Sequence, residues 1–395
     1  GVKQYLRPMS SITYTNARIY TGDQVLESGS IVVENGRILQ IDSLTSSEKI
    51  DSLTSSETIN KSRATQTIDL HGRSVAPAFI DLQVYGGNFK LFNNEPTAES
   101  IQKTWGSVRA GGAAHFQITL SCSPPEMMWR ALDACREYWA GGGEGLLGLH
   151  LEGPYFNPEK RGAHPLKNIR TANPAEVADL IERGRGVVNY LTLAPEMVDD
   201  ASLDLLLQSG IHISAGHSNA TFRQAARALD RGIGRVTHLF NAMSAFQSRE
   251  PGLVGAAFDR KPWTSIIADG IHCDFNSLRI AKAMLGEKLF LISDAVTESL
   301  LGDYRFRFSG DRYVDEGGTL AGSALTMWQG VKNVVEHAGI PLDEALRIAG
   351  TYPAQVIGEG HRLGKIAPGY AAHLVMFEEQ PLELLEMSGT AAFRL

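Results

Sequence analysis

In Leu146-Leu-Gly-Leu-His-Leu-Glu-Gly-Pro-Tyr155 an apolar run ends in a carboxylate. Glu152 closes the run, and the Gly-Pro pair that follows stops the strand that the run predicts. An ionised carboxylate in such apolar surroundings is costly unless it is paired or binds a metal ion. The stretch therefore predicts a buried strand that carries a functional acid at its carboxyl end.

The same design recurs three times downstream. Ile211-His-Ile-Ser-Ala-Gly-His217 and Arg235-Val-Thr-His238 each close a short strand with a histidine, and Phe290-Leu-Ile-Ser-Asp294 closes one with an aspartate. Imidazole and carboxylate groups are the ligands that catalytic zinc and iron sites use. Two histidines and two carboxylates on separate strands therefore favour a metal-dependent hydrolase.

Short apolar runs alternate with amphipathic helical stretches from residue 75 onward, which predicts an α/β fold. The runs number eight, as a TIM-like (β/α)8 barrel requires, and barrel enzymes place catalytic groups at the carboxyl ends of their strands. A doubly wound sheet is the alternative, but the first strand and turn, Pro77 to Gly87, lack a GxGxxG phosphate loop. The predicted strands are 79–84, 115–119, 146–151, 188–193, 211–215, 235–237, 264–268 and 289–293.

Both ends of the chain have β character. Residues 11–20 and 30–34 alternate polar and apolar side chains before the hairpin signal Asn35-Gly36, and 365–377 return to this pattern. We expect the two ends to form one small β-sandwich, with domains at 1–75, 76–360 and 361–395. A duplicated Ser/Thr-rich segment at 41–58 predicts an exposed loop, to which we assign no function. A hairpin is expected at 304–314, inserted after the eighth strand.

Composition excludes several classes of function. The 395 residues carry a formal charge of −7 without a basic tract, which argues against binding to nucleic acid or membranes. An anionic substrate would therefore need a local cationic cluster. The three cysteines, in no metal-binding spacing, are expected to be reduced core residues, and the N-terminal segment lacks a signal-peptide core. These features predict a cytoplasmic protein.

The residues at the strand ends suggest separate chemical roles. Glu152, His217 and His238 supply two imidazoles and one carboxylate for Zn²⁺ or Fe²⁺, with a position left open for water. Asp294 is the fourth group, expected to take a proton from the attacking water. His150 shares a strand face with Glu152 but is better interpreted as a hydrogen-bonded residue inside the barrel.

Polar residues in the loops after these strands are candidates for substrate binding. His164 follows Glu152 on a Gly/Pro-rich loop and could polarise a carbonyl group. Asn241 follows His238, while Arg249 and His272 could form the cationic cluster, since guanidinium groups suit phosphate geometry. An equally good interpretation of Arg249 is an ion pair with Glu250 or another surface acid.

Seven motifs, in order, resemble the N-acetylglucosamine-6-phosphate deacetylases of the amidohydrolase superfamily, over roughly residues 11–378. The motifs are His150-Leu-Glu-Gly-Pro154, Leu193-Ala-Pro-Glu-Met197, Ser214-Ala-Gly-His-Ser-Asn-Ala-Thr221, Thr237-His-Leu-Phe-Asn-Ala-Met243, Arg249-Glu-Pro-Gly-Leu253, Ile267-Ala-Asp-Gly-Ile-His272 and Gly322-Ser-Ala-Leu-Thr-Met327. The resemblance implies a barrel with a small β-sandwich, a homodimer, and hydrolysis of an acetamide on an amino sugar phosphate.

The resemblance also implies roles for individual residues. It places one divalent metal on Glu152, His217 and His238, with Asp294 as general base; Zn²⁺ is the expected ion and Fe²⁺ the alternative. His164 is expected to help polarise the acetamide carbonyl. The sugar phosphate is expected to bind at Asn241, Ala242, Arg249 and His272. One of these phosphate-binding residues is expected to come from the neighbouring subunit.

Two departures from the family pattern limit what the resemblance implies. Many amidohydrolases carry His-x-His at the end of the first strand and bind a second metal there, whereas this chain reads Gln83-Val-Tyr85. We therefore expect a site with one metal. The loop 295–302 also differs, which leaves open deacetylation of another amino sugar phosphate such as N-acetylgalactosamine 6-phosphate. A non-catalytic barrel paralogue and a nucleotide-binding dehydrogenase are the remaining alternatives. The first would have lost metal ligands, and none of the four central groups is missing here. The second needs a Gly-rich loop, which this chain lacks.

Overall fold

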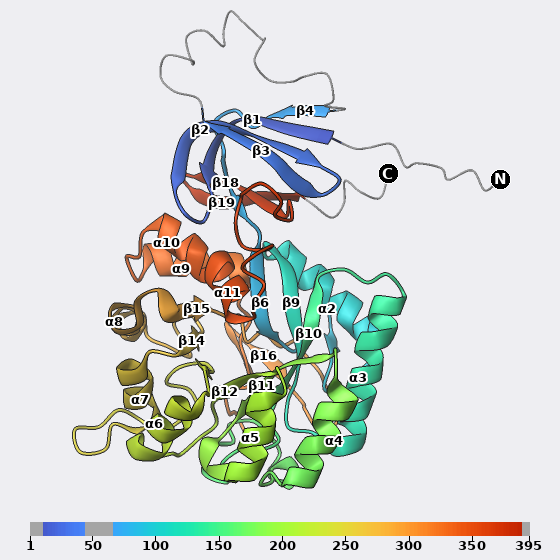
Figure 1. Ribbon diagram of the computed structural model, residues 1–395, viewed down its shortest axis with the longest axis vertical. Helices are drawn as coiled ribbons and strands as arrows, with labels where there is room; N and C mark the ends of the chain where they lie inside the picture. The colour runs from blue at the N-terminus through green and yellow to red at the C-terminus, as the bar shows by residue number, and fades with distance from the viewer. Residues whose placement is uncertain (1–10, 44–65, 389–395) are drawn as a thin grey trace, which may run out of the picture.

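The computed structural model describes residues 11–43 and 66–388. A barrel with helices around it carries a smaller, separate sheet at one end, and this sheet combines blue and red segments from the two ends of the chain (Figure 1). The predicted α/β architecture is therefore confirmed. Most of the duplicated segment lies outside the described residues, and the predicted domain boundaries at 75 and 360 stay a prediction.

Eight parallel strands form the barrel in the order β15-β14-β13-β12-β11-β10-β9-β6. The ends of the sheet meet where the Asp294 N–H donates to the Gln83 carbonyl oxygen at 3.0 Å. All eight predicted strands are confirmed, with small shifts of their ends. They are β6 (Phe79–Val84), β9 (Ala113–Leu120), β10 (Leu146–Glu152), β11 (Val188–Leu193), β12 (His212–Ala215), β13 (Arg235–Val236), β14 (Trp263–Ile266) and β15 (Leu289–Leu291).

Helices cover the outside of the barrel (Figure 1). Several of them begin at side chains that cap free backbone N–H groups: Thr221 and Gln224, for example, form a reciprocal capping box at the start of α6. None of the helices in the described ranges has the length and apolar character needed to cross a membrane. The helices are α2 (Ala98–Ala110), α3 (Pro125–Ala140), α4 (Pro174–Gly184), α5 (Asp200–Gln208), α6 (Phe222–Arg231), α7 (Gly252–Arg260), α8 (Phe275–Leu285), α9 (Met327–Glu336), α10 (Leu342–Leu346) and α11 (Tyr352–Val356), with a π-helical turn at Arg347–Thr351.

The separate sheet pairs strands from both chain ends. Its order is β19-β18-β5-β1-β2-β3, and β4 also pairs with β1. The predicted Asn35-Gly36 hairpin is confirmed between β2 and β3, but the C-terminal strand begins at Leu374, later than the predicted residue 365. The strands are β1 (Ser11–Tyr20), β2 (Val25–Glu34), β3 (Arg37–Ser43), β4 (Gln66–Asp69), β5 (Ser74–Pro77), β18 (Leu374–Glu379) and β19 (Leu382–Ser388).

Two short hairpins lie in the loops of the barrel. The predicted insertion after the last strand is present as β16 (Arg307–Ser309) and β17 (Arg312–Val314), although its first strand is shorter than expected. A second hairpin, β7 (Gly86–Gly87) with β8 (Lys90–Leu91), follows β6 directly. Both hairpins contribute to a small buried apolar cluster that includes Tyr85 and Phe306.

Candidate active site

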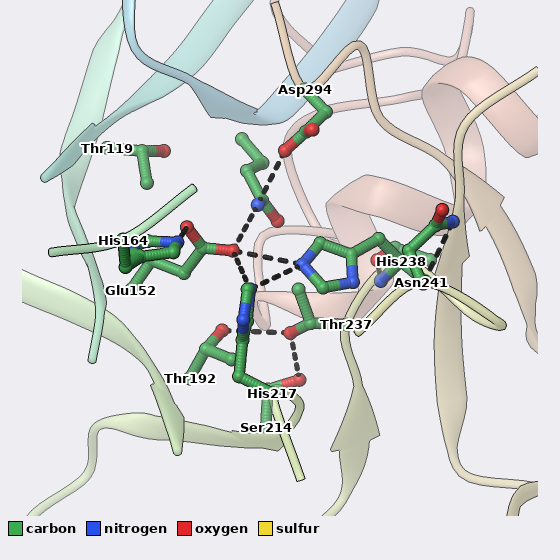
Figure 2. Close-up of polar contacts among 12 residues, drawn as sticks. Thr119, Glu152, His164, Thr192, Ser214, His217, Thr237, His238, Asn241 and Asp294 are labelled. Atoms are coloured by element: carbon green, nitrogen blue, oxygen red, sulfur yellow. Dashed lines mark hydrogen bonds and ion pairs between the residues drawn. The ribbon is translucent and has the colours of Figure 1, made fainter. Parts of the chain in front are cut away.

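The carboxylate of Glu152 is the centre of the polar contacts at the carboxyl end of the barrel (Figure 2). It ends β10 and is 2% exposed. Its Oε1 lies 3.0 Å from Nε2 of His238 and 3.1 Å from Nε2 of His217. The two imidazole nitrogens are themselves 3.1 Å apart, so three potential ligand atoms from three strands meet at one point.

The tautomer of His217 follows from its other nitrogen. Burial lowers the pKa of His217 to about 4, so the ring is neutral. Its Nδ1 lies 2.9 Å from the carbonyl oxygen of Lys160, which can only accept a hydrogen bond. Nδ1 therefore carries the proton, and Nε2 presents a lone pair toward Oε1 of Glu152. A lone pair facing a carboxylate oxygen requires a positive charge between them.

Opposing effects act on the neighbouring ring, His238. Burial by itself would lower the pKa of His238, but the hydrogen bond and attraction to Glu152 outweigh it and raise the pKa. Metal ligands must be deprotonated, so a divalent cation bound here would itself provide the positive charge between the ring nitrogens and the carboxylate. The atoms are spaced at 3.0–3.1 Å. Tetrahedral zinc, with ligands about 2.0–2.1 Å from the ion, gives an edge of about 3.4 Å. The three groups thus fit a small divalent ion in composition and approximate spacing.

His164 lies on the other side of the same carboxylate. In the described part of the chain, ligand atoms of Glu152, His164 and His217 lie within 4.8 Å of one another, so proximity alone makes His164 a third candidate ligand. Its Nδ1, however, accepts the Cys122 backbone N–H at 3.2 Å. The proton of a neutral ring is then on Nε2, which lies 3.1 Å from Oε2 of Glu152. This tautomer makes Nε2 of His164 a hydrogen-bond donor rather than a metal ligand.

Asp294 faces the same centre from the end of the eighth strand. Its Oδ1 accepts a hydrogen bond from Nε2 of Gln83 at 2.8 Å. Burial raises the pKa of Asp294 to about 7, against the opposing effect of His238 and with the added effect of the charge on Glu152. A carboxylate with a pKa near neutrality is suited to both accepting and returning a proton.

The backbone at three of these residues is unusual. The φ angles of His217, His238 and Asp294 are +47°, +35° and +54°, in the left-handed region that non-glycine residues rarely adopt. Such conformations cost about 1–3 kcal/mol each and gather at functional sites. The surrounding fold therefore holds all three side chains in orientations that the local sequence would not select.

His150 is not part of this centre. It is buried below it, with Nδ1 3.0 Å from the Leu82 carbonyl oxygen and Nε2 2.8 Å from the Thr192 hydroxyl. Burial lowers its pKa to about 4. The interpretation of His150 as a hydrogen-bonded residue inside the barrel is confirmed.

A cavity of about 180 Å³ opens above the centre. His164, Asn241, Ala242 and His272 line it together with the four strand-end residues. Arg249 does not: it lies in an exposed loop and is absent from the cavity wall. The structure therefore brings together, within one chain, every predicted site residue except Arg249. Nδ1 of His272 lies 2.6 Å from the carboxylate of Asp269.

Gln83 and Tyr85 make contacts that the sequence did not indicate. The Gln83 amide nitrogen lies 3.0 Å from Glu152 Oε1 as well as 2.8 Å from Asp294, and the Tyr85 hydroxyl lies 2.6 Å from Glu152 Oε2. Both residues stand where other amidohydrolases were expected to carry metal-binding histidines. That position was the one sequence signal that could have pointed to them.

Comparison with known proteins gives the family. The model of the Amidohydrolase family matches residues 131–393. The chain belongs to the amidohydrolase family. This amidohydrolase is also 36% identical over 320 residues to the N-acetylglucosamine-6-phosphate deacetylase of Haemophilus influenzae, covering 78% of this chain and 84% of the relative. It is 34% identical to the N-acetylgalactosamine-6-phosphate deacetylase of a Shewanella species, covering 92% and 91% of the two chains.

Solved structures agree in fold over nearly the whole chain. The N-acetylglucosamine-6-phosphate deacetylase of Pasteurella multocida superposes with a TM-score of 0.86 at 33% identity, covering 96% of this amidohydrolase and 98% of that chain. A structure of the Mycobacterium smegmatis enzyme in complex with N-acetyl-D-glucosamine-6-phosphate gives a TM-score of 0.83 at 27% identity, covering 97% and 98%. The predicted family resemblance is confirmed.

Proposed function

We propose that this amidohydrolase deacetylates N-acetylglucosamine 6-phosphate to glucosamine 6-phosphate and acetate. The observation that carries the proposal is the convergence of Glu152, His217 and His238 beside a buried Asp294 whose pKa is raised to about 7. This set combines a place for a cation with a base, as hydrolysis of an unactivated amide requires. Relatives that carry the name of this activity match most of the chain.

Glu152, His217 and His238 are the proposed ligands of one divalent ion. Zn²⁺ is preferred and Fe²⁺ is the alternative, because two imidazoles and one carboxylate suit both. A bound ion would supply Lewis acidity and make water a stronger nucleophile at neutral pH. His238 is preferred to His164 as the third ligand because the Cys122 N–H occupies the lone pair of His164 Nδ1 and leaves Nε2 as a donor.

Asp294 is the proposed general base and acid. Its carboxylate removes a proton from the attacking water and then delivers that proton to the nitrogen of the departing amine. The Gln83 amide, which donates to Oδ1, fixes the direction in which the carboxylate faces the cavity. A pKa near 7 lets the same group act in both steps.

His164 is the proposed electrophile. The His164 ring lines the cavity where the acetamide would bind, and its Nε2–H donates to Glu152 Oε2 in this structure. A donor aimed at the carbonyl oxygen stabilises the negative charge that develops there as water adds. The buried contact with the Cys122 N–H keeps the ring in the donating tautomer throughout.

The sugar phosphate is proposed to bind at Asn241, Ala242 and His272, which line the cavity. Arg249 is proposed to contribute from a second copy of the chain, since its exposed loop leaves the guanidinium free to reach another subunit. This arrangement requires a homodimer. The described residues that line the cavity include no Lys or Arg, so this wall alone offers little compensation for phosphate charge. An arginine from a second subunit would provide it.

The galactosamine epimer is the second candidate substrate. Relatives with that activity in their name match this amidohydrolase nearly as well, and Val296 from the atypical loop 295–302 lines the cavity. Acetate release by zinc-loaded protein, measured with each 6-phosphate at equal concentration, tests both. We expect a higher kcat/KM for the glucosamine compound; a preference for its epimer would assign the second activity. Release of no acetate from either would support the non-catalytic paralogue.

A cytoplasmic location is proposed from the cysteines. Cys122, Cys135 and Cys273 are all buried and free, as expected of thiols used for core packing in a reducing compartment. Fractionation of cells that produce the protein, followed by antibody detection, tests this location. Recovery of the protein in a membrane or secreted fraction would contradict it.

A further inference from the structure

Tyr85 is a buried aromatic residue that the proposed chemistry does not use. It follows β6, is 6% exposed and lines the cavity. Its ring belongs to an apolar cluster with Leu91, Val296, Tyr304 and Phe306. Both barrel hairpins border this cluster, so the position of the ring is set by packing and does not depend on what the cavity contains.

The direction of the Tyr85 hydrogen bond can be assigned from its neighbours. The phenolic oxygen lies 2.7 Å from the Gln83 amide nitrogen, which can only donate, and 2.6 Å from Glu152 Oε2, which can only accept. The phenolic proton therefore lies on the line to Glu152.

This bond divides the two oxygens of Glu152 between two tasks. Oε2 accepts from Tyr85 and His164, whereas Oε1 faces the Nε2 atoms of His217 and His238 and lies 3.0 Å from the Gln83 amide nitrogen. A carboxylate without such a partner can rotate or offer both oxygens to a metal ion. When His164 turns its proton to a substrate carbonyl, Tyr85 is the partner of Oε2 that remains.

We propose that Tyr85 is a positioning residue whose hydroxyl holds Glu152 so that a single oxygen, Oε1, is presented for binding a divalent cation. The inference rests on the metal site of the proposed function and deepens it. Partners that orient metal-binding side chains typically change metal affinity 10–100-fold when they are removed. The orientation is built by packing of the Tyr85 ring, so it exists before any ion binds.

The test compares two buried tyrosines in the same cavity. Tyr85→Phe removes the hydroxyl that holds Glu152, and Tyr304→Phe removes one that donates to the Cys122 carbonyl oxygen at 2.7 Å instead of to Glu152. Metal-free protein is titrated with Zn²⁺ against a chromophoric chelator. We expect Y85F to raise the Kd for Zn²⁺ roughly 10–100-fold, and Y304F to change it by less than about threefold.

An unchanged Zn²⁺ Kd in Y85F, or equal losses in both variants, would overturn the assignment. Circular dichroism melts of the metal-free proteins distinguish a packing defect, because a purely structural role would lower Tm without weakening zinc binding. If Y85F does not fold, Tyr85→Leu gives the same comparison in an apolar side chain. The zinc titration contains no substrate, so its result does not depend on the deacetylase assay. Wild-type protein that binds Zn²⁺ in the titration but releases no acetate in that assay would contradict only the proposed function.

Discussion

The Nε2 atoms of His217 and His238 lie 3.1 Å apart, although the two residues follow different strands. Strands β12 and β13 are neighbours in the barrel, and the backbone has a positive φ at His217, just after β12, and at His238, just after β13. Two imidazole nitrogens at this distance, both facing Glu152 Oε1, are stable only when a proton or a metal ion lies among them. The pair is therefore a place where a divalent cation could take the position of a proton.

The first prediction separates ligand from donor among the histidines. His238→Asn should lose nearly all bound zinc, because it removes one of three ligands, whereas His164→Asn should retain the metal and lower kcat about 10²–10³-fold through loss of an oxyanion donor. Metal content after gel filtration and acetate release measure the two effects. Zinc loss in the His164 variant and retention in the His238 variant would assign the site to Glu152, His164 and His217 instead.

The second prediction concerns the base. Asp294→Asn should lower kcat about 10²–10⁴-fold, the usual contribution of general acid–base catalysis, while zinc content stays near one per chain. Asp230→Asn is a matched control: it removes an exposed ion pair with Arg260, which contributes little to stability. Substantial turnover by D294N would exclude Asp294 as the base.

The third prediction concerns Arg249. Arg249→Ala should raise KM about tenfold or more with a smaller effect on kcat, because a phosphate contact is shared by bound substrate and transition state. If the arginine acts across a dimer, coexpression of R249A with D294N should give more acetate release, at substrate concentrations well below KM, than either variant gives alone. In the mixed dimer one site combines an intact Asp294 with an intact Arg249 from the other chain. No gain over the separate variants would place Arg249 outside the neighbouring site.

The fourth prediction concerns stability at the junction between the barrel and the separate sheet. His115 Nε2 and His373 Nδ1 lie 2.8 Å apart there, and burial, with Arg362 nearby, lowers their pKa values to about 3 and about 4. The unfolded chain binds protons below its ordinary histidine pKa and the folded chain does not, so stability falls as pH drops from about 6.5 toward 4.

Urea midpoints measured at pH 7 and pH 5 check this expectation. Between pH 7 and pH 5, the free energy of unfolding should fall more for wild-type protein than for His373→Gln, by on the order of 1 kcal/mol. The variant has one fewer group to protonate on unfolding. His71→Gln is the control, because His71 is exposed. Equal pH dependence in wild type and H373Q would contradict the role of the pair.

Much of the site could be predicted from local sequence. Most predicted barrel strands are short, largely apolar runs, and Glu152, His217, His238 and Asp294 stand at or just after the ends of four of them. Parallel strands in a barrel all end on one face, so residues at their carboxyl ends must approach one another. The pattern therefore sufficed for the fold and for the four central groups, although it misplaced the start of the last β segment by nine residues.

The remaining contacts depend on side-chain directions and loop paths that no local pattern records. The proton of His164 is on Nε2 because Cys122, 42 residues away in the chain, donates to Nδ1. Tyr85 reaches Glu152 because two hairpins pack its ring, and Arg249 lies outside the cavity because its loop runs over the surface. Strand ends follow from periodicity along the chain, whereas hydrogen-bond direction and loop position are set by neighbours that are close only after folding.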